Sequence, residues 1–382
     1  MINGSRRHYK VVILQRRLTH YRVPFFEALR CLLDAQGIDL KLVYGQPSAL
    51  ELSKNDQGRL AWAMEVANRY RRVGGVDLVW QPLPSAAAHA DLLVVTQENR
   101  ILSNYFHILK KHVHGRKVAF WGHGMNFQSS RPAGARERWK QFWLRQVDWW
   151  FAYTERSVEH LLRAGYPRQR ITCLNNAVDA RGFKRELASV SESCMATLRA
   201  AHGISDDAQI GLFCGSLYPD KRIDLLLNAA RLIHEQRPQF VLAVMGDGPE
   251  GPWLRSQAEK LPWLKILGPL HGQSKAVWFS LADVLLNPGL VGLLILDGFA
   301  AGLPMITTAT ARHSPEIAYL RDGENGLVAG DSPQTYADAV LSFLSDPKEQ
   351  RRLGANALAA SLEYSVENMA EKFAQGIMLC LA

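Results

Sequence analysis

The chain has 382 residues, of which 47% are hydrophobic and 21% charged, with 45 Lys and Arg against 36 Asp and Glu. This composition is ordinary for a folded globular protein and excludes a disordered chain, a collagen-like repeat and a small disulfide-rich domain. The length predicts two or three domains, and the formal net charge of +9 favours an anionic partner such as nucleic acid, an acidic membrane surface or a phosphorylated substrate.

Short apolar runs alternate with segments of helical length along both halves of the chain. In the first half, strands are predicted at 11–14, 39–44, 91–96, 117–122 and 149–154. In the second half, they are predicted at 210–217, 240–248, 264–269, 283–289 and 303–309. Apolar strands that are separated by helices are typical of parallel sheets covered on both faces.

The pattern therefore predicts an α/β protein with two Rossmann-like, doubly wound domains that face each other across a cleft. We expect a first domain over 1–185, a linker over the polar segment 186–205, a second domain over 206–365, and a C-terminal helix over 366–382 that crosses back to the first domain. Ligands of such sheets bind at the carboxyl ends of the strands.

Charge is divided unequally between the halves. Residues 1–190 hold 30 basic and 15 acidic residues, whereas residues 191–382 hold 15 and 21. The anionic partner is therefore expected at the first half. The five cysteines form no CxxC pair, and no signal peptide or membrane-spanning segment is recognised, so we expect a cytoplasmic protein whose contact with membranes is peripheral.

Three glycine-rich turns lie in the second half, each between a predicted strand and a helix. Lys221 follows the first turn, where it could bind a phosphate or be an ordinary solvated helix-start residue. The second turn, MGDGPE, allows close approach of a ligand or is a plain turn. The third precedes an apolar helix that contains Asp297, whose expected partner is a ligand hydroxyl because an unpaired buried carboxylate is costly. The glycines and candidate amides of these turns are Gly215, Ser216, Gly246, Gly248, Gly292, Leu293 and Leu294.

The order GSLYPDKRID, MGDGPE, ILGPL, NPGLVGLLILDGFAAGLP and HSPEI resembles the C-terminal domain of family-four retaining glycosyltransferases, which have the GT-B fold. The resemblance implies transfer of a sugar from a nucleoside diphosphate sugar to an acceptor hydroxyl, with retained anomeric configuration. Lys221 matches the family's diphosphate-binding lysine, and the GLVGLL turn matches its phosphate-binding amides. Asp297 stands where the family has the second glutamate of a pair, which holds the ribose hydroxyls.

Two positions depart from the family pattern. The first glutamate of the pair is Gly289 here, and the usual arginine of the lysine motif is Ser216. Either the donor is held differently, with a contribution from Glu316, or activity is weak or absent. We favour an active transferase, with a degenerate, non-catalytic nucleotide-sugar-binding or partner protein as the alternative.

The first half resembles the family more weakly. His123 of WGHG falls where the family has a cleft histidine near the reacting carbon, while a structural histidine is the alternative. His20, Tyr21 and Arg22 follow the first strand and are expected on the acceptor side of the same cleft. The catalytic candidates are therefore His123, Lys221 and Asp297.

Segment 131–150 has aromatic residues at helical spacing among basic ones, which favours an interfacial membrane helix or an ordinary helix packed on its sheet. The aromatic and apolar positions are Trp139, Phe142, Trp143, Val147 and Trp150. The basic positions are Arg131, Arg136, Arg138, Lys140 and Arg145, with Lys110, Lys111, Arg116 and Lys117 nearby in sequence. An anionic membrane and a glycan or lipid-linked acceptor are the expected partners; no nucleic-acid-binding motif, dinucleotide fingerprint, cofactor site or metal site is found.

Overall fold

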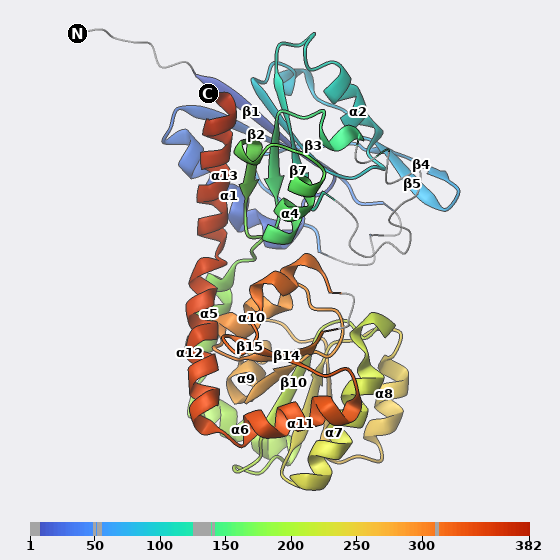
Figure 1. Cartoon of the computed structure of the whole chain (residues 1–382), viewed down its shortest axis with the longest axis vertical. Coiled ribbons are helices and arrows are strands. Elements are labelled where there is room, and N and C mark those ends of the chain that lie inside the picture. Colours follow the sequence, from blue (N-terminus) through green and yellow to red (C-terminus); the bar gives the residue numbers. More distant parts are fainter. Residues whose placement is uncertain (1–7, 49–50, 52–55, 125–138, 140–141, 310–312) are drawn as a thin grey trace, which may run out of the picture. The chain divides into compact units, whose positions relative to one another are not determined.

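The computed structural model describes residues 8–48, 51, 56–124, 139, 142–309 and 313–382. The chain divides into two compact units, Met1–Asp179 with Val366–Ala382, and Ala180–Ser365. Each unit is built around a parallel sheet with helices packed against it, so both are Rossmann-like (Figure 1). That the two sheets face each other across a cleft stays a prediction.

The sheet of the first unit has the strand order β3-β2-β1-β6-β7-β8-β9 over the described residues. Its strands are β1 (Tyr9–Gln15), β2 (Ile38–Gly45), β3 (Met64–Val66), β6 (Leu92–Thr96), β7 (Lys117–Gly122), β8 (Trp149–Ala152) and β9 (Ile171–Cys173). Its helices are η1 (His20–Arg22), α1 (Val23–Asp34), η3 (Ser85–Ala87), α2 (Leu102–Leu109), α4 (Glu155–Arg163), η4 (Arg168–Arg170) and α13 (Val366–Leu381). A separate antiparallel hairpin joins β4 (Arg69–Val73) and β5 (Val76–Trp80).

The sheet of the second unit has the order β12-β11-β10-β13-β14-β15. Its strands are β10 (Ile210–Cys214), β11 (Val241–Met245), β12 (Leu264–Gly268), β13 (Val284–Leu286), β14 (Met305–Thr308) and β15 (Gly326–Ala329). Its helices are α5 (Ala180–Ala188), α6 (Glu192–His202), η5 (Pro219–Lys221), α7 (Ile223–Gln236), α8 (Gly251–Ala258), α9 (Gly272–Leu281), α10 (Leu294–Ala300), η6 (Pro315–Tyr319), α11 (Pro333–Leu344) and α12 (Pro347–Glu363).

The apolar runs form the central strands because both faces of each sheet are covered. Val11–Leu14 of β1 are at most 1% exposed, as are Leu212 and Phe213 of β10. All the strands predicted from apolar runs are present, whereas the short edge strands β3, β9 and β15 lack such a run and were not predicted. The direction of strand order reverses between β1 and β6 in one sheet and between β10 and β13 in the other. Loops after these strands are the expected ligand positions.

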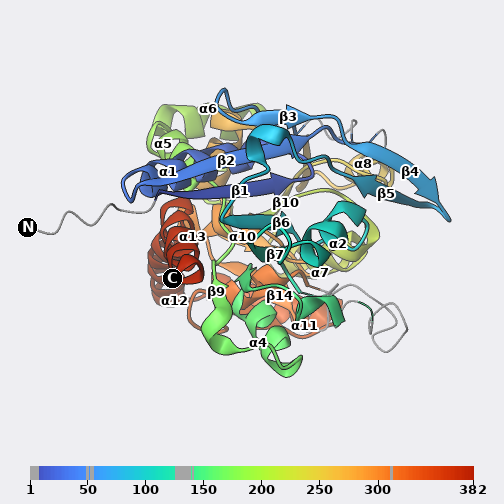
Figure 2. The same cartoon turned by 90° about the horizontal axis from the view of Figure 1, so that it is seen from above.

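The boundaries of the two units differ from a simple division of the chain into an N-terminal and a C-terminal half. Residues 186–205, which we expected as a linker, contain the end of α5 and the helix α6, and both helices belong to the second unit. The last helix, α13, packs beside α1 in the first unit (Figures 1 and 2). Its Phe373 stacks on Phe151 with ring centroids 4.0 Å apart. Stretches distant in sequence therefore share one core.

Candidate functional site

The turns after β10 and β11 are packed against each other. A Cβ on Gly246 would lie 1.9 Å from the carbonyl oxygen of Gly215, and one on Gly248 would lie 2.4 Å from that of Leu217. Gly215 and Gly246 also have φ angles of 145° and 135°, which side chains rarely allow. Ser216 is exposed beside them. These glycines are therefore required for packing between the turns, which holds the carboxyl ends of the two strands together.

Lys221 is a buried cation at the end of η5. Its side chain is 6% exposed, and its Nζ donates a hydrogen bond to the carbonyl oxygen of Leu290. No carboxylate within ion-pair distance is found among the described residues, and burial lowers the pKa of Lys221 to about 8. A buried ammonium group without a counter-charge is costly, and an anionic ligand would remove that cost.

The loop after β13 lies directly against Lys221, which explains the first departure from the family pattern. The amide of Leu290 donates to the carbonyl oxygen of Asp220, 2.8 Å away. A Cβ on Gly289 would lie 2.3 Å from the carbonyl carbon of Lys221. Because this contact is with backbone, a glutamate at position 289 cannot be accommodated without moving one of the two loops.

The predicted phosphate-binding amides lie at the start of α10, a helix of seven residues. Gly292, Leu293 and Leu294 are partly exposed, and their amides have no acceptor among the described residues. The preceding Val291 accepts a hydrogen bond from the amide of Ser314 and donates one to Nδ1 of His313. The segment that carries Glu316 is thereby fixed against this loop. Glu316 itself is 5% exposed within η6.

Asp297 has a partner that the sequence did not indicate. Its carboxylate forms an ion pair with Lys275 of α9, with 2.8 Å between Oδ2 and Nζ. The pair forms because α9 and α10 bring the two side chains together, and the expected contact of Asp297 with a ligand hydroxyl stays a prediction. Lys275 also lies over the ring of Phe183, 4.6 Å from its centroid. No local motif in the sequence marks Lys275.

Three charged groups surround the end of β10. Burial raises the pKa of Cys214 to about 11, and the charges of Lys275, Asp297 and Lys221 also act on its thiol. The structure therefore brings Lys221 and Asp297 together around one strand end and adds a second lysine. This arrangement of two cations and one carboxylate leaves one excess positive charge, which suits an anionic group.

The candidates of the first unit have different environments. His123 follows β7 and its ring lies 4.4 Å from that of Tyr153. His20 is exposed and Tyr21 is partly buried. Arg22, expected on the acceptor side of the cleft, is only 6% exposed and donates from Nη2 to Oδ1 of Asn176, 2.6 Å away.

The burial of Arg22 has a clear physical basis. Its guanidinium lies 5.2–5.4 Å from the ring centroids of Tyr21, Trp121 and Tyr153, as expected for cation–π contacts. Nη1 also contacts the sulfur of Met369 in α13 at 3.5 Å. Arg22 therefore joins the loop after β1 to the C-terminal helix, and the structure supports a packing role for it.

The predicted interfacial helix is only partly described. Arg131, Arg136, Arg138 and Lys140 lie outside the described residues. Trp143, Val147 and Trp150 are buried, whereas Trp139 and Phe142 are exposed by 51% and 57%. Of the two alternatives for this segment, packing in the core therefore holds for Trp143, Val147 and Trp150.

The predicted basic cluster is not a free surface patch either. Lys111 pairs with Asp148 at 2.8 Å, and the buried Arg116 bonds His107. Lys117 donates to the carbonyl oxygen of Cys380, and Arg145 donates to that of Ala164. Of the basic residues in 110–117, Lys110 keeps an exposed side chain without such a polar contact among the described residues.

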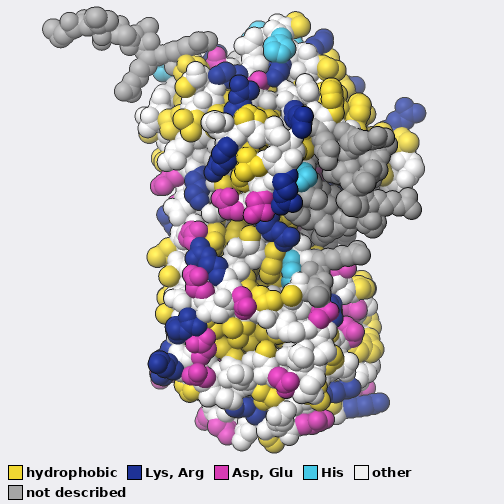
Figure 3. All heavy atoms as spheres, viewed as in Figure 1, with side chains coloured by type: hydrophobic (Ala, Val, Ile, Leu, Met, Phe, Trp, Pro, Cys, Tyr) yellow, Lys and Arg dark blue, Asp and Glu magenta, His cyan; other side chains and the backbone are white. Residues whose placement is uncertain are grey.

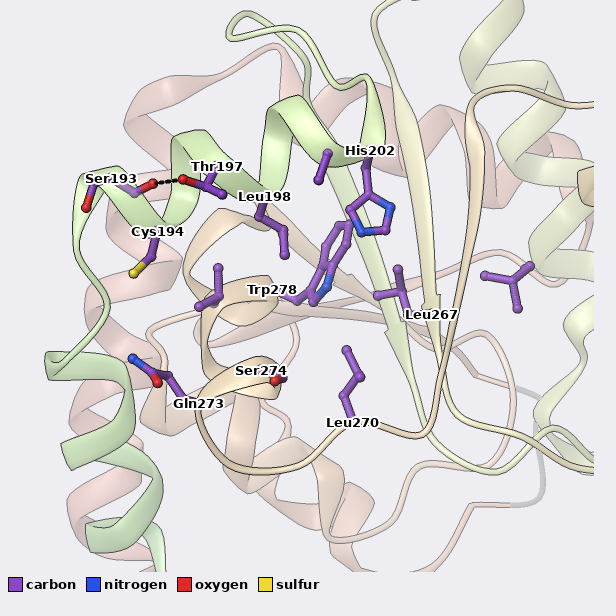
Figure 4. A pocket seen from close by; sticks show the side chains of 13 residues that line it. Ser193, Cys194, Thr197, Leu198, His202, Leu267, Leu270, Gln273, Ser274 and Trp278 are labelled. Carbon is purple, nitrogen blue, oxygen red and sulfur yellow. Dashed lines mark hydrogen bonds between the residues drawn. The ribbon is translucent and has the colours of Figure 1, made fainter.

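A separate groove of about 610 Å³ lies between α6 and α9 in the second unit (Figure 4). Leu198, Leu267, Leu270 and Trp278 give it an apolar wall, and the ring of His202 lies 5.1 Å from that of Trp278. None of the predicted site residues lines this groove. Among the described residues, no cluster of His, Cys, Asp and Glu could hold a metal ion, and no described helix is long and apolar enough to cross a membrane.

Comparison with known proteins gives one family match. Residues 208–346 match the family model "Glycosyl transferases group 1". The chain is 30% identical over 197 residues to the D-inositol 3-phosphate glycosyltransferase of Streptomyces scabiei, covering 47% of this chain and 43% of that protein. It is 28% identical over 288 residues to the putative glycosyltransferase EpsD of Bacillus subtilis, covering 68% and 69%. The matched region spans less than half the length of the Streptomyces relative.

Solved structures extend the likeness of fold to nearly the whole chain. Anabaena Alr3699/HepE in complex with UDP matches with a TM-score of 0.68 at 16% identity, covering 97% of this chain and 99% of that one. Sucrose-phosphate synthase from Thermosynechococcus elongatus matches with a TM-score of 0.65 at 16% identity, covering 96% and 98%. The chain therefore has the GT-B type of fold, which consists of two Rossmann-like units.

Proposed function

We propose that the chain is a glycosyltransferase of the family-four type that transfers a sugar from a nucleoside diphosphate sugar to an acceptor hydroxyl. The group 1 glycosyl transferase match over residues 208–346 and the likeness of fold to glycosyltransferase structures support this proposal. The observation that carries the proposal is Lys221, a buried cation beside unpaired amides at the topological switch point of the second sheet. The Anabaena neighbour was solved with UDP and with UDP-glucose, which supports a nucleotide-sugar donor here.

The donor diphosphate would bind between Lys221 and the amides of Gly292, Leu293 and Leu294. Lys221 supplies one positive charge, and the amides supply fixed dipoles. Asp297 would bind the ribose hydroxyls while Lys275 holds its carboxylate in place. Lys275 also acts electrostatically on the thiol of Cys214 at the end of β10, two residues before Ser216, where the family pattern has an arginine.

The proposed transfer retains the anomeric configuration. The first unit offers His123 near the expected cleft, and the site has no evident covalent nucleophile among the described residues. The leaving diphosphate would deprotonate the acceptor hydroxyl on the face from which it departs. The protein would stabilise the charge that develops on the diphosphate, without a metal ion.

The proposed acceptor is a glycan or a lipid-linked glycan at the inner face of a membrane, used in building bacterial cell-surface polysaccharide. The first unit holds 28 basic and 16 acidic residues, against 17 and 20 in the second. On the face seen in Figure 3, Lys and Arg side chains are spread over the first unit among hydrophobic ones. This excess supports an anionic membrane or lipid phosphate as the partner of the first unit.

A second candidate function is nucleotide-sugar binding without transfer. The observation in its favour is the backbone contact that closes position 289, because it removes the carboxylate that the family directs at the donor sugar. An active transferase would have to hold the sugar hydroxyls in another way, for which the buried Glu316 is the nearest candidate in sequence.

Donor binding by Lys221→Met tests the proposal. We expect the affinity of the full chain for UDP-glucose to fall roughly tenfold or more, since a charge-assisted contact contributes about 1.5–3 kcal/mol. The matched control is Lys260→Met, because Lys260 is an exposed lysine of the same unit. Equal binding by the wild type and both variants, in calorimetry across a panel of nucleotide sugars, would reject the site.

A further inference from the structure

Among the described residues, one face of the first unit carries apolar and basic side chains and no acidic ones. It is formed by the hairpin β4–β5, by α2 and by the turn that follows, and is called the hairpin–α2 face. Its members are Arg69, Arg71, Val73, Val76, Leu78, Trp80, Leu102, Phe106, Leu109, Lys110 and Val113. Figures 1 and 2 show the hairpin beside α2.

The hairpin separates its side chains onto two faces. Arg69 pairs with Trp80, and Val73 pairs with Val76, so these four side chains share one face together with those of Arg71 and Leu78. Trp80, Val73 and Val76 are exposed by 40%, 52% and 38%. On the opposite face Val79 is fully buried. The acidic residue of the hairpin, Asp77, lies on that opposite face, across from Arg72.

Helix α2 continues the same surface. Leu102, Phe106 and Leu109 are spaced as neighbours on one side of a helix and are 38–69% exposed, and Val113 beyond them is 81% exposed. The ring of Trp80 lies 5.7 Å from that of Phe106, which joins the hairpin to the helix. The ammonium of Lys110 lies 4.6 Å from the same ring. Residues 102–117 contain no Asp or Glu.

We propose that the hairpin–α2 face lies on an anionic lipid bilayer and docks the first unit there. This inference rests on the membrane association in the proposed function. It assigns the membrane contact to the hairpin–α2 face and not to segment 131–150. Aromatic and aliphatic side chains would enter the boundary between headgroups and acyl chains, while Arg69, Arg71 and Lys110 would contact lipid phosphates. Apolar side chains with this exposure form a patch that water disfavours.

Charge distinguishes a bilayer from a second copy of the chain. A symmetric dimer through this face would bring Arg69, Arg71 and Lys110 close to the same basic groups of its copy. None of the described members of the face is acidic, so nothing among them would compensate this charge. An anionic bilayer would bury the apolar side chains and also provide phosphates for the basic ones. The hairpin is also a separate two-stranded element outside the main sheet, so its exposed face is not needed to complete that sheet.

Cosedimentation of the full chain with vesicles tests the proposal. The vesicles contain equal parts phosphatidylglycerol and phosphatidylcholine, and pure phosphatidylcholine vesicles provide the neutral comparison. We expect Leu109→Glu to weaken binding roughly tenfold or more, and Arg69→Gln with Arg71→Gln to weaken it about fivefold for each arginine.

Matched controls carry the same changes elsewhere. Leu379→Glu alters a leucine of α13 that is 63% exposed, close to the 69% of Leu109. Lys348→Gln with Arg351→Gln removes the same charge from an exposed part of the second unit. Both controls should bind as the wild type does, and all variants should unfold at the wild-type temperature because the changed side chains are exposed.

Three outcomes would overturn the proposal. The first is that the wild type does not bind anionic vesicles, and the second is that it binds neutral vesicles equally well. The third is that the control substitutions weaken vesicle binding as much as the substitutions on the hairpin–α2 face do. Self-association that Leu109→Glu abolishes, without vesicle binding, would instead assign the face to a second copy. No nucleotide sugar is present in this assay, so its result is independent of whether transfer occurs.

Discussion

At the scale of single residues, Lys221 and Gly289 determine what the second unit can bind. Lys221 is buried with a carbonyl oxygen as its polar partner, and Gly289 is held against the backbone of that same lysine. The first is a local cost to stability that an anion would remove. The close contact of Gly289 explains why this chain has glycine where the family pattern has a glutamate, since a larger side chain would displace one of the two loops.

The depressed pKa of Lys221 predicts a dependence of stability on pH. Below about pH 8 the lysine is charged in both states, and the folded chain bears the full cost of burying it. Between about pH 8 and 10.5 the folded chain has released the proton while the unfolded chain still holds it, so the unfolding free energy rises with pH. Relative to Lys221→Met, the wild type should gain about 3 kcal/mol across this window.

Urea titrations of both proteins at pH 7 and at pH 9.5 test this dependence, and about 2 kcal/mol of the gain should be present by pH 9.5. At pH 7 the methionine variant should be the more stable of the two. Lys260→Met, which alters an exposed lysine, should follow the wild type at both pH values. A stability difference between the wild type and Lys221→Met that does not change with pH would contradict the burial of a charged lysine.

Gly289→Ala is expected to destabilise the second unit by about 2 kcal/mol or more, because its Cβ would lie 2.3–2.4 Å from backbone atoms of Asp220 and Lys221. Gly292→Ala is the control: the nearest atom to its Cβ would be Oγ of Ser314 at 4.0 Å, so stability should stay within about 1 kcal/mol. Equal unfolding midpoints for the two variants would show that the loops are not in contact.

At the scale of elements, the ion pair between Lys275 and Asp297 connects α9 with α10. The side chains are 20% and 21% exposed, so the pair is partly shielded from solvent. A double-mutant cycle with Lys275→Ala and Asp297→Asn should give a coupling of about 1 kcal/mol in the free energy of unfolding. Lys275→Arg should keep most of this coupling free energy. If the effects of Lys275→Ala and Asp297→Asn are additive, the two side chains do not form an ion pair that stabilises the fold.

The strands and helices show which features a sequence reveals. Runs such as Val11–Leu14 predict the central strands, because a strand that is buried on both faces consists of consecutive apolar residues. The pairing of Lys275 with Asp297 was not foreseen, since it depends on how two helices meet. The sequence does not decide whether Arg22 and Trp143 are buried, for a similar reason: a long basic or aromatic side chain looks alike in sequence whether it is buried or exposed.

At the scale of the whole molecule, the net charge of +9 combines two units of opposite sign. The first unit has a formal charge of +12 and the second of −3. The donor site therefore uses local groups, Lys221 and its neighbouring amides, within a unit that is acidic as a whole. The basic excess belongs to the unit whose exposed hairpin–α2 face is the proposed membrane surface.

Sugar transfer by the full chain tests the central claim most directly. The chain is incubated with a panel of nucleotide sugars, with and without membrane extract, and release of nucleoside diphosphate is measured. We expect release from one donor, stimulated by the extract, and lost in both Lys221→Met and Asp297→Asn. If no donor is turned over, and neither variant changes the binding of any donor, the chain is not a glycosyltransferase that uses this site.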